Sequence, residues 1–406
     1  MNSTAREHDI VVYGATGFVG LLTAKYLAEA APDDVKIALG GRSQEKLERT
    51  KAELGVDWPL VVADSSDAAA VKALAESTKV VATTVGPYFK YGKQLVEACA
   101  AAGTHYADLT GEVLFMRWSI DAADAAAKES GAKIVHTCGF DSIPSDIGTL
   151  LLHEAAQAGG HGDLGETALV VKSMKGGASG GTIDSMRVSV DEVKKDKSGR
   201  RTLTDPYALT PDPAEEPSGK DERDSLKPFQ DDRLGGWMAP FVMGTVNSRV
   251  VRRSNSLQGH AYGKGLRYRE LMKTGGGPLG LVKAAGVAGG IAGVFAGMAT
   301  PGARQVLDRV LPDPGEGPSE QARESGFFNI DIHTTTSDGT HLRCEIRAPG
   351  DPGYKATAVM LGESALSLAQ DDLPEGGGVL TPATAMGTKL ADRLRAAGHS
   401  YEVVPD

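Results

Sequence analysis

The chain has 406 residues, of which 41% are hydrophobic and 24% are charged, and its net charge is −10. These values are typical of a soluble globular protein long enough for two domains, and the acidic balance argues against a general nucleic-acid binder. The three cysteines form no metal-type pair, so we expect a reducing cytoplasm and no metal site. The polar N-terminal residues predict neither a signal peptide nor a transit peptide.

The first informative pattern joins a strand, a glycine-rich turn and a helix. Asp9–Tyr13 is an expected strand and Phe18–Ala31 an expected helix, with three glycines at spacing three between strand and helix. Exposed N–H groups and the positive end of the helix dipole attract a dinucleotide pyrophosphate at such a turn. We therefore expect the cofactor to contact Gly14, Ala15, Thr16, Gly17, Phe18, Val19 and Gly20. A tight turn without a ligand is the alternative.

Strands and helices continue to alternate through the first 140 residues. Further strands are expected at Val35–Leu39, Leu60–Ala63, Val80–Val85, His105–Leu109 and Lys133–Cys138. Helices are expected at Gln44–Leu54, Ala68–Glu76, Gly92–Ala102 and Leu114–Ser130. This alternation predicts an α/β fold with a Rossmann-type, doubly wound parallel sheet over residues 1–146. Ligands in such sheets lie at the carboxyl ends of the strands.

The end of the second expected strand separates NAD from NADP. An NAD site has an acidic residue there to bind the ribose hydroxyls. This chain has Gly40-Gly41-Arg42-Ser43 instead, and Arg42 with Ser43 can hold the 2′-phosphate of NADP. A solvated cation at the helix start is the alternative for Arg42. Asp64, after the third strand, is a candidate adenine contact or a helix cap.

The loop after the fourth expected strand is the next candidate contact with the cofactor. Val85, Gly86 and Pro87 form a rigid backbone that can approach the nicotinamide. Tyr88 or Tyr91 would then lie near the reacting ring, although either tyrosine could serve packing alone.

The pattern changes after residue 146, and residues 147–375 are expected to form a second, α+β domain for substrate or dimerisation. Expected elements are a strand at Glu166–Lys175, a helix at Thr182–Lys194, a hairpin of Phe327–Thr336 with His341–Ala348, and helices at Pro352–Ala369 and Pro382–Ala397. Residues 198–234 are polar and proline-rich and read as a surface flap. Residues 376–406 are expected to return to the first domain.

Residues 275–302 are rich in glycine and alanine. From Leu279 to Thr300 the only charge is Lys283, and small residues recur every four positions. Three interpretations are open: a membrane span, a contact with a membrane surface or lipid tail, or a helix packed within the protein or a homodimer.

Three motifs together carry a family resemblance. Val85-Gly86-Pro87-Tyr88 is followed by Gly103-Thr104-His105-Tyr106-Ala107-Asp108-Leu109-Thr110-Gly111-Glu112 and by Gly139-Phe140-Asp141-Ser142-Ile143-Pro144-Ser145-Asp146. These residues resemble the saccharopine dehydrogenase-like oxidoreductases, and most of all the actinobacterial trans-acting enoyl reductases. The resemblance implies NADPH-dependent reduction of carrier-bound or lipid-like enoyl thioesters made by a polyketide synthase. The amino-acid-binding arginines of true saccharopine dehydrogenases have no match here.

Enoyl reduction needs a hydride at the β-carbon, a proton at the α-carbon and stabilisation of the enolate oxygen. Candidate catalytic residues are Tyr88, Asp141 and Ser142; the segments Asp108–Glu112 and Gly176–Thr182 could also supply hydrogen-bond donors. Helix capping and loop bracing are the alternatives for these groups. The basic segment His260–Arg269 could receive an acyl carrier protein or could be a solvated surface.

The main functional expectation is therefore an NADP-dependent enoyl reductase in lipid or polyketide synthesis. One alternative is a saccharopine dehydrogenase-like reductase of a soluble imine or ketone. Another is a non-catalytic, NADP-binding scaffold associated with membranes or lipid. The expected location is the cytoplasm, with peripheral membrane contact left open.

Overall fold

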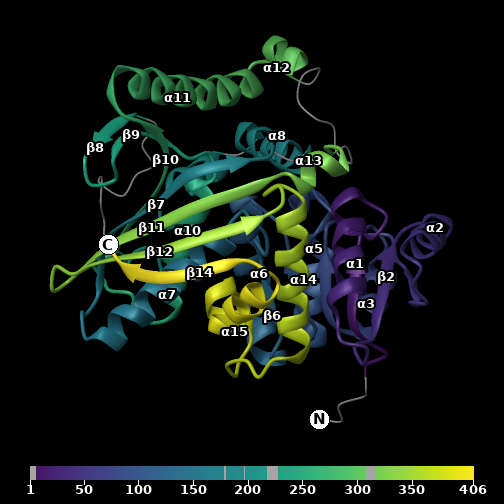
Figure 1. Ribbon diagram of the computed structural model, residues 1–406. Helices are drawn as coiled ribbons and strands as arrows, with labels where there is room; N and C mark the ends of the chain where they lie inside the picture. Colours follow the sequence, from purple (N-terminus) through teal and green to yellow (C-terminus); the bar gives the residue numbers. More distant parts are fainter. Residues whose placement is uncertain (1–5, 178–179, 196, 217–226, 308–316) are drawn as a thin grey trace.

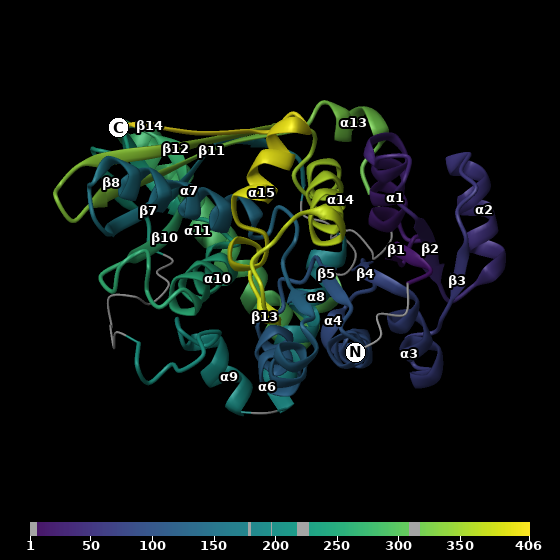
Figure 2. The same ribbon diagram turned by 90° about the horizontal axis from the view of Figure 1, so that it is seen from below.

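The computed structural model describes residues 6–177, 180–195, 197–216, 227–307 and 317–406. Two seven-stranded sheets organise this part of the chain (Figure 1). Seen from below, the first sheet and the helices around it lie beside the longer strands of the second sheet (Figure 2).

The first sheet is parallel and has the order β13-β6-β5-β4-β1-β2-β3. Its strands are β1 (His8–Tyr13), β2 (Ile37–Gly41), β3 (Leu60–Val62), β4 (Thr78–Thr83), β5 (His105–Asp108), β6 (Lys133–Val135) and β13 (Gly378–Leu380). This order is that of a Rossmann fold extended by one strand, so the expected fold class is confirmed.

Helices cover both faces of this sheet because alternate residues of each strand point to opposite sides. Ile10 and Val12 of β1 join a core with α1 (Phe18–Ala30) and α14 (Lys355–Gln370). Val11 and Tyr13 join a separate core with α3 (Ala68–Ser77), α5 (Lys93–Ala102) and α6 (Val113–Ser130). The remaining helices of this half are α2 (Gln44–Leu54) and the single turn α4 (Tyr88–Tyr91).

The second sheet has the order β14-β12-β11-β7-β10-β9-β8. Its strands are β7 (Leu164–Lys175), β8 (Phe229–Asp231), β9 (Gly236–Pro240), β10 (Arg267–Gly275), β11 (Phe327–Thr336), β12 (His341–Pro349) and β14 (Ser400–Pro405). β7 and β10 are parallel neighbours, whereas β11 and β12 form the expected antiparallel hairpin.

One face of this second sheet is apolar, and the other is polar at β11 and β12 but carries a smaller apolar cluster over β7, β9 and β10. Phe328, Ile330 and Ile332 of β11 pack in the main core, where α7 (Ile143–Gly159) contacts β11 and β12. On the opposite face, Asp331 of β11 pairs with Arg347 of β12. This alternation is the period-two pattern from which the hairpin was expected.

Several expectations about individual elements were wrong. The second strand covers 37–41 rather than 35–39, and the fourth covers 78–83 rather than 80–85. The sixth strand ends at Val135 because the backbone turns at Thr137, whose φ is +60°. The expected flap at 198–234 includes most of α9 (Lys197–Thr204) and all of β8, and its residues 217–226 lie outside the described part.

The C-terminal residues contribute to both sheets. β13 adds to the edge of the first sheet beside β6, α15 (Pro382–Ala396) packs on α7 and α14, and β14 adds to β12 in the second. The remaining helices are α8 (Gly180–Lys195), α10 (Gly244–Leu257), α11 (Gly277–Ala299), α12 (Pro301–Leu307) and α13 (Glu320–Glu324).

Candidate active site

The glycine-rich turn lies at the carboxyl end of β1 and leads into α1. Gly14 has φ +94°, a conformation that residues with a side chain rarely adopt. Gly17 is the N-terminal cap of α1 and uses no side chain for capping. A Cβ atom on Gly20 would lie 2.1 Å from the carbonyl oxygen of Gly14, so only glycine allows this close approach of helix and turn. The turn therefore has the geometry expected of a pyrophosphate cradle.

The side chains expected to recognise the 2′-phosphate lie at the ends of β2 and β3. Arg42 is exposed directly after β2. The hydroxyl oxygen of Ser43 accepts the N–H of Lys46 at 3.4 Å and caps α2. Asp64 is exposed and accepts hydrogen bonds from Ser66, which together with the nearby Arg42 lower its pKa. Arg42 is thus available to a phosphate, while Ser43 also serves the helix.

A buried carboxylate, that of Glu112, holds the loop after β4 in place. The oxygens of Glu112 accept the backbone N–H groups of Tyr88 at 2.8 Å and Phe89 at 2.9 Å. A third hydrogen bond comes from the hydroxyl of Ser185 on α8. Burial raises the pKa of Glu112, against the opposing effect of these donors. Glu112 thereby ties the expected nicotinamide loop to α8.

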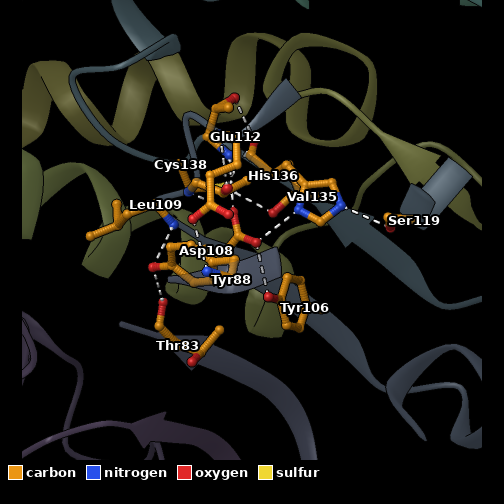
Figure 3. A network of polar contacts seen from close by, with 12 residues as sticks. Thr83, Tyr88, Tyr106, Asp108, Leu109, Glu112, Ser119, Val135, His136 and Cys138 are labelled. Carbon is orange, nitrogen blue, oxygen red and sulfur yellow. Dashed lines mark hydrogen bonds and ion pairs between the residues drawn. The ribbon is translucent and has the colours of Figure 1, made fainter. Parts of the chain in front are cut away.

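The hydroxyl of Tyr88 is used within the fold. It donates to the carbonyl oxygen of Thr83 and accepts the N–H of Leu109, as Figure 3 shows. Burial raises the pKa of Tyr88 well above its usual value. Tyr88 therefore braces the ends of β4 and β5 through its hydroxyl, and it also lines the cavity described below.

Asp108, at the end of β5, is the centre of a buried polar network (Figure 3). Its carboxylate accepts the hydroxyl of Tyr106 and the N–H groups of Thr110 and Thr137, and it lies 2.8 Å from Nδ1 of His136. The network fixes the loops after β5 and β6.

The same network contains an Asp–His–Ser arrangement, because Nε2 of His136 lies 2.9 Å from the hydroxyl of Ser119. Such an arrangement is known from hydrolases. Here Ser119 is fully buried, and the void beside His136 has a volume of about 10 Å³, room for about one water molecule. We conclude that this arrangement is structural.

A cavity of about 1060 Å³ lies at the carboxyl ends of the first-sheet strands. The glycine turn and the loop after β4 form one wall through Gly17, Phe18, Gly86 and Pro87. The opposite walls come from α8, α10 and α11. The volume is at the upper end of the range for small-molecule sites, so the cavity can hold a nicotinamide together with a sizeable apolar substrate.

The described lining of this cavity includes two carboxylates, that of Asp184 on α8 and that of Asp141. Its side chain is half-buried in the wall, next to Phe140 and close to the loop that carries Tyr88. Burial, reinforced by the negative charge of Asp108, raises the pKa of Asp141 to about 7. A carboxyl group in this state can exchange a proton near neutral pH.

The structure brings Tyr88 and Asp141 together in the cavity wall, but Ser142 points elsewhere. The hydroxyl of Ser142 is fully buried and donates to the side-chain oxygen of Asn247 at 3.0 Å. The amide of Asn247 in turn donates to Glu270. Ser142 therefore belongs to a polar chain between α7, α10 and β10.

Two other expected segments differ from their expected form. In the basic segment, Arg267 pairs with Glu166, Arg269 with Asp231 and His260 with Glu216. In the loop Gly176–Thr182, the N–H of Gly180 lies 3.3 Å from the Tyr354 hydroxyl, whereas Ala178 and Ser179 lie outside the described residues.

The motif Asp108–Glu112 predicts hydrogen-bond donors for the site, whereas Glu112 accepts hydrogen bonds and braces the loop after β4. A buried acid at the start of α6 gives no local signal of its partner 24 positions earlier. The contributions of α8, α10 and α11 to the cavity were missed for the same reason, since only the folded chain brings these helices opposite the glycine turn.

Comparison with known proteins identifies relatives of this chain. Residues 10–135 match the family described as the saccharopine dehydrogenase NADP binding domain. A Mycobacterium tuberculosis protein provisionally named a trans-acting enoyl reductase is 48% identical over 99% of both chains. A protein of Mycobacterium ulcerans named trans-acting enoyl reductase is 44% identical over 98% of both chains.

A solved structure has a similar fold at low sequence identity. Saccharopine dehydrogenase (L-Glu forming) from Saccharomyces cerevisiae matches 98% of this chain and 100% of its own, with a TM-score of 0.54 and 13% identity. This likeness supports the arrangement of the two sheets.

Proposed function

The chain belongs to the trans-acting enoyl reductase family and is an NADP-dependent oxidoreductase, and from this premise we propose that it reduces the carbon–carbon double bond of carrier-bound or lipid-like enoyl thioesters. The observation that carries the proposal is the cavity in which the glycine turn, the loop after β4 and Asp141 meet. When bound, NADPH supplies the hydride that enters the β-carbon.

The residues proposed to hold the cofactor are those at the carboxyl ends of β1 to β4. Backbone N–H groups of the turn from Gly14 to Gly20 bind the pyrophosphate, and Arg42 with Ser43 binds the 2′-phosphate. Val85, Gly86 and Pro87 support the nicotinamide. Asp64 lies beside Arg42 and can order its guanidinium.

Asp141 is proposed as the proton donor. In its protonated form it gives one proton to the α-carbon, so that one hydride and one proton together saturate the double bond. Its carboxylate is then reprotonated from solvent through the open side of the cavity. The proposed role needs a carboxyl group that is protonated near neutral pH, which its pKa of about 7 satisfies.

For the partner we propose an acyl carrier of a polyketide synthase system. Lys194 near the end of α8 and Arg200 and Arg201 on α9 are all exposed, and none of the described carboxylates forms an ion pair with them. Lys194 also lines the cavity. These three cations form a better binding site for an acidic carrier than His260–Arg269, where Arg267 and Arg269 already have carboxylate partners. A cytoplasmic location fits such a partner.

The test is NADPH oxidation by the purified chain with enoyl thioesters of increasing chain length, presented on N-acetylcysteamine and on an acyl carrier protein. The proposal expects stoichiometric formation of the saturated thioester, with NADPH preferred over NADH. Reduction of an imine or ketone in place of all enoyl thioesters would support a soluble-substrate reductase. NADPH binding without turnover of any of these compounds would support a scaffold.

A further inference from the structure

Helix α11 is the most exposed apolar element in the described part of the chain. It has 23 residues with a mean hydropathy of 1.7 over its most apolar window, of which 17% is buried. Four of the seven exposed large hydrophobic residues lie on it, namely Leu279, Leu281, Val282 and Phe295. Figure 1 shows α11 at the outer edge of the molecule, above β8, β9 and β10. Exposed apolar surface of this extent marks an interaction site.

The two sides of α11 have different environments, one facing the protein and the other exposed. Gly280, Ala284, Ala288 and Met298 are buried on the side that faces the protein. On the same side, Ile291 and Val294 line the cavity opposite the glycine turn. The other side carries Leu279 at 65% exposure and Val282 at 66%. One helix thus separates the cavity from the surroundings.

Contacts on the buried side of α11 also fix its orientation on the protein. The hydroxyl of Thr274 on β10 donates to the carbonyl oxygen of Gly280 at 2.9 Å. A Cβ atom on Gly280 would lie 3.1 Å from the ring of Trp237 on β9. At 1.5 Å per residue the helix is long enough to cross a bilayer, but these contacts hold it along the body of the protein. It is therefore suited to lie in a membrane surface rather than to span it.

Charge distinguishes between possible partners. Residues 271–307 contain Lys273, Lys283 and Arg304 and no carboxylate, in a chain whose net charge is −10. A second copy would bring the same cationic segment to the contact and gain no charge complementarity. An anionic lipid surface attracts Lys273 and Lys283, whereas Arg304 already pairs with Asp191 of α8 at 2.6 Å.

We propose that the outer side of α11 docks the protein on an anionic membrane, with Leu279, Leu281 and Val282 inserted among the lipids. The cavity then lies directly behind the membrane-facing helix. An acyl chain can pass from the bilayer along α11 to the cofactor side with little exposure to water. This delivery step rests on the proposed enoyl reductase function, whereas the docking does not.

The experiment is flotation of the purified full-length chain with vesicles of phosphatidylcholine alone or mixed equally with phosphatidylglycerol, without substrate. We expect flotation with the anionic vesicles, a loss of at least tenfold in the bound fraction for the double variant L279D/V282D, and a loss of about fivefold in affinity for K283E. The matched control is V62D, which changes a side chain of 49% exposure on β3 and should float like the wild type.

Each variant is also checked for NADPH binding by nicotinamide fluorescence and for oligomeric state by light scattering. Failure of the wild type to float, or equal flotation of L279D/V282D, would overturn the docking proposal. A wild-type dimer that L279D/V282D converts to a monomer, without flotation of either, would overturn it in favour of a second copy. A chain that floats as expected but reduces no enoyl thioester would refute the proposed function and leave the docking standing.

Discussion

The carboxylate of Glu112 accepts the backbone N–H of Tyr88 at 2.8 Å, and the two residues belong to different strand–helix units of the first sheet. A second oxygen of the same carboxylate accepts the N–H of Phe89. Because Tyr88 directly follows Gly86 and Pro87, this contact fixes the position of the loop that is proposed to support the nicotinamide. The Ser185 hydroxyl on the same carboxylate extends the brace to α8.

Replacing Glu112 by alanine should therefore affect both stability and catalysis. The buried N–H of Tyr88 and the half-buried N–H of Phe89 would lose a charged acceptor, and we expect a loss of about 3 kcal/mol in the free energy of unfolding. The displaced loop should lower kcat by at least tenfold. Urea denaturation and steady-state kinetics measure the two effects. Glu112→Gln keeps one acceptor oxygen and should lie between wild type and alanine; equal stability of all three proteins would show that the brace is unimportant.

Asp141→Asn tests the proposed proton donor. The amide cannot release a proton, so kcat should fall by roughly 10²–10⁴-fold, while NADPH binding is retained. In the wild type, kcat should decline as the pH rises above about 7, because the protonated carboxyl group is lost. Ser142→Ala is the neighbouring control, since that hydroxyl faces Asn247. A larger loss with Ser142→Ala than with Asp141→Asn would reverse the assignment.

These residues show which features of the fold and of the site could be predicted from the sequence alone. The glycine turn, Arg42 and the β11–β12 hairpin depend on local patterns, so their expected positions agree with the structure to within a few residues. Asp141 could be nominated because it follows a strand. Its raised pKa could not be predicted, because it depends on burial in the cavity wall and on Asp108, 33 positions away.

The walls of the cavity could be predicted from the sequence even less well. The apolar composition of α11 predicted an unusual helix, but three interpretations remained open until its buried side and its exposed side were known. The brace from Glu112 to Tyr88 and Ser185 joins three separate segments. No spacing along the chain encodes such a contact.

The raised pKa of Asp141 also makes a prediction about stability. The pKa of an aspartate in an unfolded chain is about 3.9, whereas the pKa of Asp141 in the folded protein is raised to about 7. Between these two pH values the folded state therefore binds more protons than the unfolded state. The contribution of Asp141 is therefore fully favourable below about pH 4 and is lost as the pH rises through about 7. Asp141→Asn should be more stable than wild type at pH 8 and similar at pH 4.5, by chemical denaturation. A variant that is less stable at pH 8 would contradict the raised pKa.

Arg42→Asp tests the choice of cofactor. Loss of a charge-assisted contact with the 2′-phosphate, together with repulsion by the new carboxylate, should lower the NADPH preference over NADH by about 100-fold in kcat/KM. Arg49→Asp on α2 is a suitable control because Arg49 already pairs with Glu45 and lies away from the end of β2. An Arg42→Asp protein that still prefers NADPH to the wild-type extent would exclude Arg42 as the phosphate ligand.

The double variant Arg200→Glu/Arg201→Glu tests the proposed carrier contact. Reversing two exposed charges should raise KM for an enoyl group on an acyl carrier protein by about tenfold, mainly by slowing association. Turnover of the same group on uncharged N-acetylcysteamine should not change, because neither arginine lines the cavity. The wild-type KM for the carrier substrate should rise with ionic strength, and that of the variant should rise less. The matched control, Lys264→Glu/Arg267→Glu, reverses two charges in the segment that the sequence had suggested. If this control raises KM and the α9 variant does not, the carrier binds near β10 instead.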